Sequence, residues 1–424
     1  MLLILFGIFF LMMIINMPIA YCIGFGVLGA MVLTTGLPVS IIPLKMYSMI
    51  NSFPLLAIPL YVMAGNIMNK SGITTRLINL ARVIIGFVKG GIAMAAVLAS
   101  MFFGGVSGSS LADTAAIGSV MIPEMRKEGY DKHFAVALIA SAGTLGGIIP
   151  PSISMVLYGV VSGTSIAALF IAGALPGVIL GIAFMIVSYI YAWKHGYPVG
   201  PKPTVKGALK ALVDGLLPLG MPIIIVGGIY GGVFTATEAG IIAILYALVV
   251  GLFIYRSLTI KDILEAIIES AETSAIPALI IAFSGSFAFL SSYADVPRTM
   301  STFIYSITTS KVLILILINI MLLIIGMFMD GAAVYPIVVP IFLPLMKQMG
   351  ISPLQFGVII VLNLSIGLIT PPVGGTLYTA CAISGLQPIP VAKKALYFIT
   401  VAIGVLMLAT FIPWISEFLP SLMG

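Results

Sequence analysis

The sequence predicts an all-α protein that crosses a membrane many times. Hydrophobic residues make up 61% of the chain and charged residues only 8%, whereas a typical soluble domain is about 25% charged. Many apolar runs approach the roughly 20 residues that a helix needs to cross a ~30 Å hydrocarbon core. Glycines and prolines interrupt these runs at matching places in the two halves of the chain. We therefore expect an inverted repeat with two re-entrant hairpins and two broken helices.

The composition also excludes other classes of protein. The formal net charge of +6 would suggest a nucleic-acid partner in a soluble chain. In a membrane protein it is explained by the Lys and Arg residues of cytoplasmic loops, so we expect a lipid bilayer and no nucleic acid. Cys22 and Cys381 lie in apolar sequence, which argues against disulfides and metal clusters. The run from Leu2 to Ile15 lacks a basic segment and a cleavage site, which predicts a first short helix and not a signal peptide.

The first repeat is expected over residues 1–193. Continuous helices are expected where apolar residues dominate, and interrupted ones where Gly and Pro break the apolar runs. In chain order these are helices at 1–15, 19–36 and 53–69, a more polar helix at 73–88, a hairpin at 91–127, a broken helix at 133–166 and a closing helix at 172–192.

A cytoplasmic linker is expected at residues 194–215. The stretch Trp193–Leu212 contains Lys194, Lys202, Lys206 and Lys210 and no acid, and short cytoplasmic loops are rich in Lys and Arg. The second repeat, residues 216–424, then follows the plan of the first. Its elements are helices at 216–233, 238–255 and 275–292, a polar helix at 297–308, a hairpin at 311–347, a broken helix at 355–386 and a helix at 395–415.

The two halves keep a constant register through their interrupted segments. An offset of 221 residues relates Gly105 to Gly326, Pro123 to Pro344, Gly129 to Gly350, Gly146 to Gly367 and Pro150-Pro151 to Pro371-Pro372. Equivalent loops exchange their charge, because Lys393-Lys394 stand where the first half has the neutral Ala172-Gly173. Basic loops mark the cytoplasmic side, so this exchange indicates that the halves face opposite sides of the membrane.

The two hairpins are expected to enter the membrane and return to the same side. Residues 91–127 have one sharp break, at Gly104–Ser110, and basic residues on both flanks, which favours entry from the cytoplasm. Residues 311–347 should enter from the outside and turn at Gly326–Ala333. Non-helical backbone is tolerated at such depth only where protein or a wet cavity encloses it.

The breaks supply the groups that an ion site needs. The first tip carries Ser107, Ser109 and Ser110, and Pro150-Pro151 and Pro371-Pro372 unwind the helices that follow the hairpins. Half-helix ends direct carbonyl dipoles at cations and amide dipoles at anions. Oxygen-rich sites with few carboxylates suit Na⁺ better than a transition metal. The alternative is that these residues are packing glycines and kinks, as in many spanning helices.

Few polar side chains lie in the apolar segments. Asp113 and Asp330 follow the two tips, and an acid inside a membrane is a functional candidate. For each, stabilising a helix N-terminus or relaying a proton is an alternative. Ser154 and Thr376 fall just past the proline breaks and could face a solute, whereas Asn319 and Asn363 are expected to join helices. No phosphate-binding loop or nucleophile–base set is present, so we expect a gradient-driven transporter and not an enzyme.

These motifs resemble the large membrane subunit of tripartite ATP-independent periplasmic (TRAP) transporters. The resemblance is carried by Gly104–Asp113 with Ile122-Pro123, Ile148–Ser152, Ser52–Ala57 and Thr370–Pro372, and it spans essentially the full chain. It implies an ion-transporter-superfamily elevator fold and Na⁺-coupled uptake of an organic acid across the bacterial inner membrane. It also implies two partners, a separate small four-helix membrane subunit and a periplasmic substrate-binding protein.

The same resemblance implies where Na⁺ and solute would bind. One Na⁺ would lie at the first tip, and a second at the second tip, with the solute carboxylate between them. The first set is Ser107, Gly108, Ser109, Gly146, Ile149 and Pro150; the second is Gly326, Met329, Gly331, Gly367 and Thr370; the solute set is Ser107, Ser154, Asp330 and Thr376.

The substrate class stays open between sialic acid and C4-dicarboxylates. Ser52–Arg82 and Met155–Gly177 look most like sialic-acid members, but such a member is expected to carry an arginine near position 293, where this chain has Tyr293. The alternative function is a proton-coupled antiporter or exporter of an organic anion, with Asp113 or Asp330 as the proton carrier.

Overall fold

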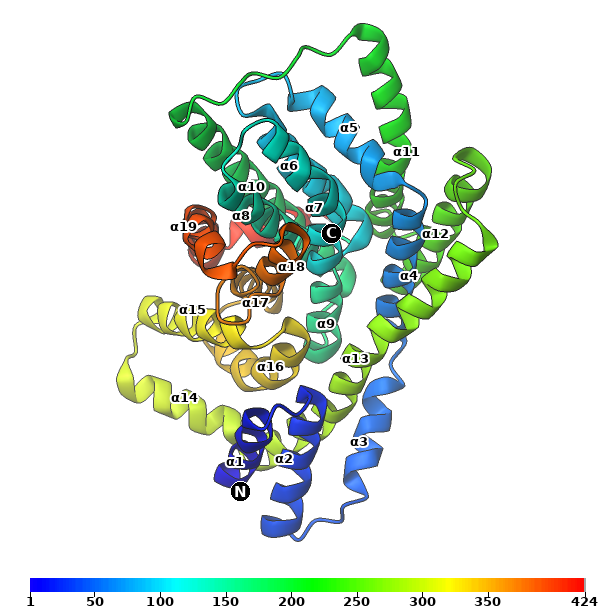
Figure 1. Ribbon diagram of the computed structural model, residues 1–424. Coiled ribbons are helices and arrows are strands. Elements are labelled where there is room, and N and C mark those ends of the chain that lie inside the picture. The colour runs from blue at the N-terminus through cyan, green and yellow to red at the C-terminus, as the bar shows by residue number, and fades with distance from the viewer. Residues whose placement is uncertain (423–424) are drawn as a thin grey trace.

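The computed structural model describes residues 1–422, and within them all regular secondary structure is helical. Seven helices are long and apolar enough to cross a membrane, and the bent pair 41–50 and 53–70, with a 60° angle between its parts, would make an eighth. The predicted multi-pass, all-α class is therefore confirmed. The helices form two bodies that lie side by side and are joined by two connecting helices (Figure 1).

The first body, called the framework here, is built around the long diagonal helix α13 (Figure 1). It comprises α1 (Leu2–Ile14), α2 (Ile19–Thr34), α3 (Ile41–Ile50), the 3₁₀ turn η1 (Phe53–Leu56), α4 (Ala57–Lys70), α11 (Val205–Tyr230), α12 (Ala236–Val249), the π-helical turn η3 (Val250–Ile254) and α13 (Ile260–Tyr293).

Helix α4 packs against both α12 and α13, and polar pairs fix this contact. The Tyr61 hydroxyl donates to the Ala236 carbonyl at 2.7 Å. Asn66 Nδ2 donates to Ser270 Oγ at 2.9 Å, and Lys70 Nζ lies 3.1 Å from a Glu265 carboxylate oxygen. Each pair joins residues that are 175 or more positions apart. The framework is therefore held together by segments from both halves of the chain.

The second body, called the hairpin body, contains both hairpins and both broken helices. It comprises α6 (Gly91–Ser107), α7 (Ser110–Lys127), α8 (Lys132–Gly143), the 3₁₀ turn η2 (Thr144–Gly147), α9 (Ile153–Ser162), α10 (Ile166–Lys194), α15 (Lys311–Phe328), α16 (Gly331–Gln348), α17 (Pro353–Gly367), α18 (Gly375–Ser384), α19 (Pro388–Phe411) and α20 (Trp414–Ser421).

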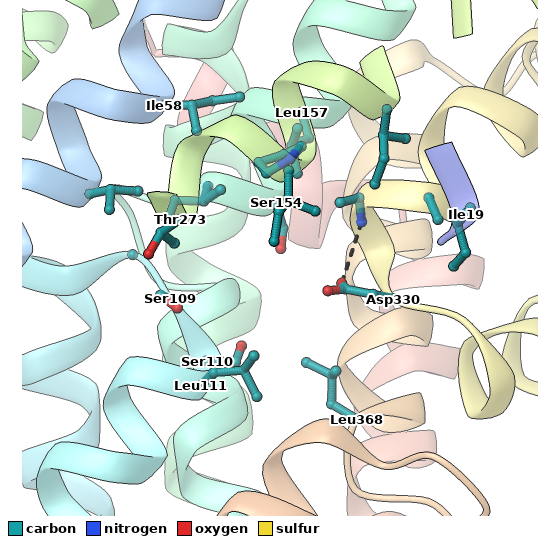
Figure 2. Close-up of a pocket in the computed structure, with 18 residues that line it drawn as sticks. Ile19, Ile58, Ser109, Ser110, Leu111, Ser154, Leu157, Thr273, Asp330 and Leu368 are labelled. Carbon is teal, nitrogen blue, oxygen red and sulfur yellow. Dashed lines mark hydrogen bonds between the residues drawn. The ribbon is translucent and has the colours of Figure 1, made fainter. Parts of the chain in front are cut away.

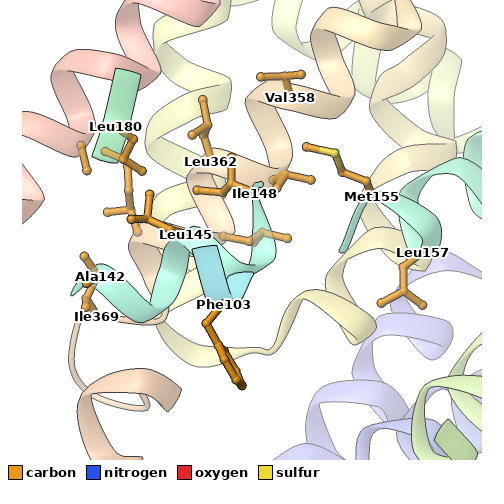
Figure 3. Packing of buried hydrophobic residues seen from close by; sticks show 14 of the residues in the cluster. Phe103, Ala142, Leu145, Ile148, Met155, Leu157, Leu180, Val358, Leu362 and Ile369 are labelled. Carbon is orange, nitrogen blue, oxygen red and sulfur yellow. The ribbon is translucent and has the colours of Figure 1, made fainter. Parts of the chain in front are cut away.

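The hairpin body has a buried apolar core between the first broken helix and its neighbours. Phe103 of α6, Leu145 and Ile148 at the break, Leu180 of α10 and Leu362 of α17 are all buried there (Figure 3). Fully burying a side chain of this size contributes about 1.5–3 kcal/mol where water is the alternative environment. The unwound backbone at the break is thus enclosed by protein, as non-helical backbone within a membrane requires.

Two amphipathic helices connect the bodies. Helix α5 (Ile73–Ile85) leads from α4 to α6, and α14 (Val296–Ile307) leads from α13 to α15 (Figure 1). On α5 the buried residues recur at helical spacing, among them Ile73, Leu77 and Leu80, which places one apolar stripe against the protein. These are the two more polar helices that the sequence predicts at 73–88 and 297–308.

Helix starts differ most from the predicted ranges. Helix α11 begins at Val205 and not at 216, so residues 205–215 of the predicted linker 194–215 are helical. Helix α13 begins at Ile260 and not at 275, and α3 was not predicted. The reason is capping: the Thr204 hydroxyl accepts from Gly207 N at 3.2 Å, and Thr259 and Asp262 form a reciprocal capping box. Hydropathy detects the apolar part of a helix, whereas the cap decides where it begins.

Asn319 and Asn363 join three helices, as predicted. Asn363 Nδ2 donates to Asn319 Oδ1 at 2.7 Å, and Asn319 Nδ2 donates to Thr410 Oγ1 at 3.2 Å. All three side chains are buried.

Replacing Asn363 with alanine should lower the free energy of unfolding by about 0.6–2 kcal/mol, the range measured for hydrogen bonds between membrane helices. Thermal unfolding of the purified chain would measure this loss. In a double-mutant cycle with Asn319→Ala the two losses should not add, because both variants remove the same bond. Fully additive losses would show that the two amides do not act as a pair.

Candidate functional site

The first hairpin turns at two residues. Helix α6 ends at Ser107, Gly108 has φ +63°, and Ser109 is the N-cap of α7, with its hydroxyl accepting from Ala112 N at 3.4 Å. The sequence predicted a wider break, Gly104–Ser110, but Gly104 and Gly105 are helical. The reason is that Gly104 serves close packing: a Cβ there would lie 2.9 Å from the Cα of Gly146.

The first tip is bonded to the break between α8 and α9. Ile153 N donates to the Gly108 carbonyl at 3.1 Å, and the Ser110 hydroxyl donates to the Thr144 carbonyl at 3.4 Å. Gly146 lies so close that a Cβ there would be 3.0 Å from the Ser109 carbonyl oxygen. The predicted partners of the first ion set, Ser109 and Gly146, are thus brought together by backbone contact.

The second hairpin has the same kind of contact with the second broken helix. Only Met329 and Asp330 are non-helical between α15 and α16, and Asp330 Oδ1 accepts from Ala332 N at 3.4 Å as the N-cap of α16. Val373 N donates to the Met327 carbonyl at 3.1 Å, and Gly326 and Gly367 meet backbone to backbone. Residue 367 must be glycine because a side chain there would collide with the main chain of Gly326.

A cavity of about 460 Å³ lies between the two tips and the framework. Figure 2 shows Ser109 and Ser110 of the first tip on one side of it and Asp330 of the second tip on the other, with Ser154 of α9 beside them. Thr273 of α13 adds a hydroxyl from the framework side. The volume lies within the range of small-molecule sites.

The two walls of this cavity differ in chemistry. The hairpin body contributes three serine hydroxyls and the Asp330 carboxylate, whereas the framework contributes one hydroxyl, Thr273, and otherwise apolar side chains. Those apolar residues are Ile19, Ile58, Val62, Ile276, Pro277 and Ile280. Among the lining residues in the described part of the chain there is no Lys, Arg or His, so Asp330 is the one charged side chain.

The predicted residues fall into three positions relative to the cavity. Gly108, Ser109, Ser154 and Asp330 line it. Ser107 is buried directly beneath the first tip, and Thr376 is buried with its hydroxyl donating to the Leu368 carbonyl at 2.9 Å, so the structure does not bring these two side chains into the cavity. The others lie at the tips and breaks and are not among the lining residues: Gly146, Ile149, Pro150, Gly326, Met329, Gly331, Gly367 and Thr370.

Asp113 is placed behind the first tip and not in the cavity. It lies in the first turn of α7 and is fully buried, and the Ser100 hydroxyl of α6 is near its carboxylate, although no hydrogen bond of good geometry joins them. Its side chain faces Gly146 at the break: a Cβ there would lie 3.2 Å from Asp113 Oδ2. Glu238, by contrast, completes a capping box with Thr235 and has a structural explanation.

Sequence reasoning missed the framework wall of the cavity. Thr273, Ile276, Pro277 and Ile280 belong to α13, whose start was predicted at 275. A threonine and a proline within one turn of a long apolar helix were the available signal. Tertiary packing decides which face of α13 meets the hairpin tips. The local sequence pattern does not carry that information.

Comparison with known proteins assigns the chain to a family. Residues 6–415 match the model of the "Tripartite ATP-independent periplasmic transporter, DctM component". A sialic acid TRAP transporter large permease of Vibrio cholerae, SiaM, is 36% identical over 96% of this chain and 95% of its own length. A C4-dicarboxylate large permease of Pseudomonas aeruginosa, DctM, is 37% identical over 94% of both chains.

A third relative is longer than this chain. The isethionate TRAP transporter permease DctMQ of Oleidesulfovibrio alaskensis is 38% identical over 98% of this chain, which spans 66% of that protein. Among solved structures, the Alcanivorax borkumensis YdaH transporter shares the fold with a TM-score of 0.60 at 17% identity, over 90% of this chain and 89% of its own. The chain therefore belongs to the DctM family, the large permease component of TRAP transporters.

Proposed function

We propose that this permease takes up a small organic acid together with Na⁺, by an elevator movement of the hairpin body against the framework. The observation that carries the proposal is the cavity between the hairpin tips, with four hydroxyls, one carboxylate and no basic side chain in the described residues. The relatives are named for sialic acid, C4-dicarboxylates and isethionate, all of them acids. Sialic acid and C4-dicarboxylates are the two classes that we propose for this chain.

The charge of the cavity supports coupling to a cation. An acid bound here lies near Asp330 without any Lys or Arg in the cavity wall to compensate either charge. Two like charges in a partly desolvated site repel by several kcal/mol at an effective dielectric constant near 20. Na⁺ bound at the two tips would remove that repulsion. The carbonyl and hydroxyl oxygens of the two predicted ion sets would hold these ions. The proposed Na⁺ ligands therefore also explain how an anion can bind beside Asp330.

The two unlike walls support the elevator movement. Three of the four hydroxyls and the carboxylate belong to the hairpin body, so a solute would bind mainly to that body. The framework presents a mostly apolar wall, which forms few directed bonds that movement would have to break. Helices α5 and α14 and the segment 195–204 between α10 and α11 are the connections that would bend. Hinge and element-terminal residues are where such movements are usually absorbed.

The family also suggests partners and a location. We propose that a periplasmic substrate-binding protein delivers the acid, and that a small four-helix membrane subunit is a separate chain. The location proposed is the bacterial inner membrane, with residues 194–215 in the cytoplasm and the two repeats 1–193 and 216–424 in opposite orientations. The lysines of that segment support the orientation, since basic residues mark cytoplasmic loops.

Electrogenic uptake in proteoliposomes tests this function. With two Na⁺ per monoanion, one net positive charge enters, and each 100 mV, negative inside, is worth ~2.3 kcal/mol. Accumulation should therefore rise about 50-fold per 100 mV and require an inward Na⁺ gradient. The assay needs the permease, the small subunit and the binding protein, with labelled sialic acid and succinate as candidate substrates. Electroneutral uptake of sialic acid, a monoanion, or Na⁺-independent uptake of either acid would contradict the proposal; the succinate dianion carried with two Na⁺ moves no net charge.

A proton-coupled exporter is the second candidate, and Asp113 is the observation that favours it. Asp113 is fully buried, and acidic side chains enclosed within a membrane often belong to proton pathways. That mechanism predicts transport driven by a pH gradient at constant Na⁺, with no need for a binding protein. The same proteoliposomes, energised by a pH gradient alone, distinguish the two mechanisms.

A further inference from the structure

A second polar cavity lies between α5 and the start of α11. Its volume is about 380 Å³. Arg76, Asn79 and Arg82 line it from one face of α5, and Thr204, Lys210 and Asp214 line it from α11 and its N-cap. The residues of the first set are three positions apart, and those of the second are six and four positions apart. Side chains at such spacings project from one side of a helix. The cavity is therefore formed by two polar helix faces turned toward each other.

The charges that face this cavity do not cancel. Three cationic side chains, Arg76, Arg82 and Lys210, stand against one acid, Asp214. Arg82 also forms an ion pair with Glu124 of α7 and lies near Glu128, both outside the cavity lining, so the uncompensated charge of the cavity rests mainly on Arg76 and Lys210. For Lys210 and Asn79, the described residues provide no side-chain hydrogen bond or ion pair. The cavity thus combines excess positive charge with donors that are not yet used.

One wall of the cavity is rigidly built. Arg76 donates to the carbonyls of Ser71 and Gly72 at 3.2 and 3.1 Å, and its guanidinium lies 3.5 Å from the centroid of the Tyr255 ring. The Tyr255 hydroxyl in turn donates to the Asp214 carbonyl at 2.8 Å. These contacts fix Arg76 relative to α11 before any ligand arrives. A guanidinium held in place loses less conformational entropy when it binds an anion.

The cavity lies where α11 changes from polar to lipid-facing sequence. Leu209, Leu212, Val213 and Leu216 form an exposed apolar stripe on α11, next to the face that carries Lys210. Upstream, Lys202 and Lys206 are exposed. A phospholipid has a matching arrangement, with a charged phosphate next to apolar acyl chains. Basic residues at a membrane surface attract anionic lipid headgroups.

We propose that the cavity between α5 and α11 binds a phosphate group, and that the headgroup of an anionic phospholipid supplies it. The phosphate contacts Arg76, Arg82 and Lys210, and the acyl chains lie along the apolar stripe of α11. Arginine suits this ligand because its planar fork matches phosphate oxygens in two parallel hydrogen bonds. The bound lipid joins the connecting helix α5 to the framework. The site is separate from the transport cavity and does not depend on the proposed transport function.

Lipid binding to the purified full-length chain in detergent tests the site. The probes are dioctanoyl phosphatidylglycerol, dioctanoyl phosphatidylcholine and inorganic phosphate, and the readout is the shift in thermal unfolding temperature against probe concentration. Phosphatidylglycerol should stabilise the chain at lower concentration than phosphatidylcholine. Lys210→Gln should weaken phosphatidylglycerol binding about fivefold, as expected for one basic residue at a membrane surface.

Lys206→Gln is the matched control, because it removes the same charge from an exposed position one turn earlier on α11, outside the cavity lining. It should leave binding nearly unchanged. A second test variant, Asn79→Asp, adds an acid to the cavity and should weaken binding at least as much as Lys210→Gln. Equal losses for Lys210→Gln and Lys206→Gln, or equal binding of the two lipids, would overturn the proposal. If inorganic phosphate alone gives the Lys210-dependent shift, the phosphate site stands and the lipid source is overturned.

Discussion

Replacing Asp330 with asparagine is expected to reduce Na⁺-dependent uptake about a hundredfold. Asp330 is the one charged side chain in the described lining of the transport cavity. At about 4 Å and an effective dielectric constant near 20, a carboxylate attracts a bound cation by ~4 kcal/mol, and partial exposure leaves somewhat less. Asparagine is as good an N-cap as aspartate, so α16 should still begin at Gly331. The variant therefore removes charge and keeps the local structure.

The measurement is the initial uptake rate as a function of Na⁺ concentration. Asp330→Asn should raise the Na⁺ concentration needed for half-maximal uptake, because the lost interaction is with the cation. Asp295→Asn provides the control, since Asp295 is also an N-cap residue, at α14, but lies outside the cavity lining and makes no side-chain capping hydrogen bond in the described part of the chain. An Asp330→Asn permease with unchanged Na⁺ dependence would assign this carboxylate to helix capping alone.

Replacing Gly108 with alanine is expected to lower uptake at least about thirtyfold without removing the protein from the membrane. Gly108 has φ +63°, and a Cβ there would lie 2.6 Å from the Pro151 carbonyl oxygen. The left-handed conformation alone costs a non-glycine residue about 1–2 kcal/mol, and the contact with backbone adds to this because the main chain cannot rotate away. The tip must then move off the break, which would open the proposed first ion set.

Gly163→Ala separates these two causes. Gly163 has a nearly identical φ of +69°, at the end of α9, but an added Cβ would meet nothing within 4 Å. It therefore carries the conformational cost without the collision. Uptake by the two variants, normalised to the amount of permease in the vesicles, should differ by tenfold or more. Equal losses would mean that backbone strain, and not the contact between tip and break, limits transport.

The interrupted segments could be located from the sequence because their causes are local. Glycine, serine and double proline determine backbone conformation within a few residues, so the breaks at Gly108–Ser109 and Pro150-Pro151 coincide with those residues. The role of Gly104 could not be assigned in this way, since its contact with Gly146 depends on how α6 and η2 pack. A glycine that turns a chain and one that allows close packing look alike in sequence.

The framework wall of the cavity illustrates the second limit. Thr273 is an ordinary threonine within a helix of 34 residues, and its hydroxyl donates to the Glu269 carbonyl at 2.7 Å. It becomes a lining residue only because α13 packs against the hairpin body next to α16. Spacing along the chain carries no information about that packing. The predicted residues therefore all lie on the side of the hairpins and broken helices, where Ser109, Ser154 and Asp330 line the cavity, and none lies on the framework side.

The pairs between α4 and the later framework helices have a consequence for biogenesis. Tyr61 finds its acceptor, Ala236, 175 residues further along the chain. At ~5–20 residues per second, a ribosome needs about 10–35 s to synthesise that interval. Throughout this time Tyr61, Asn66 and Lys70 are already made while their partners are not. Until the second half is made, these polar groups therefore need temporary partners, such as water, lipid headgroups or other protein.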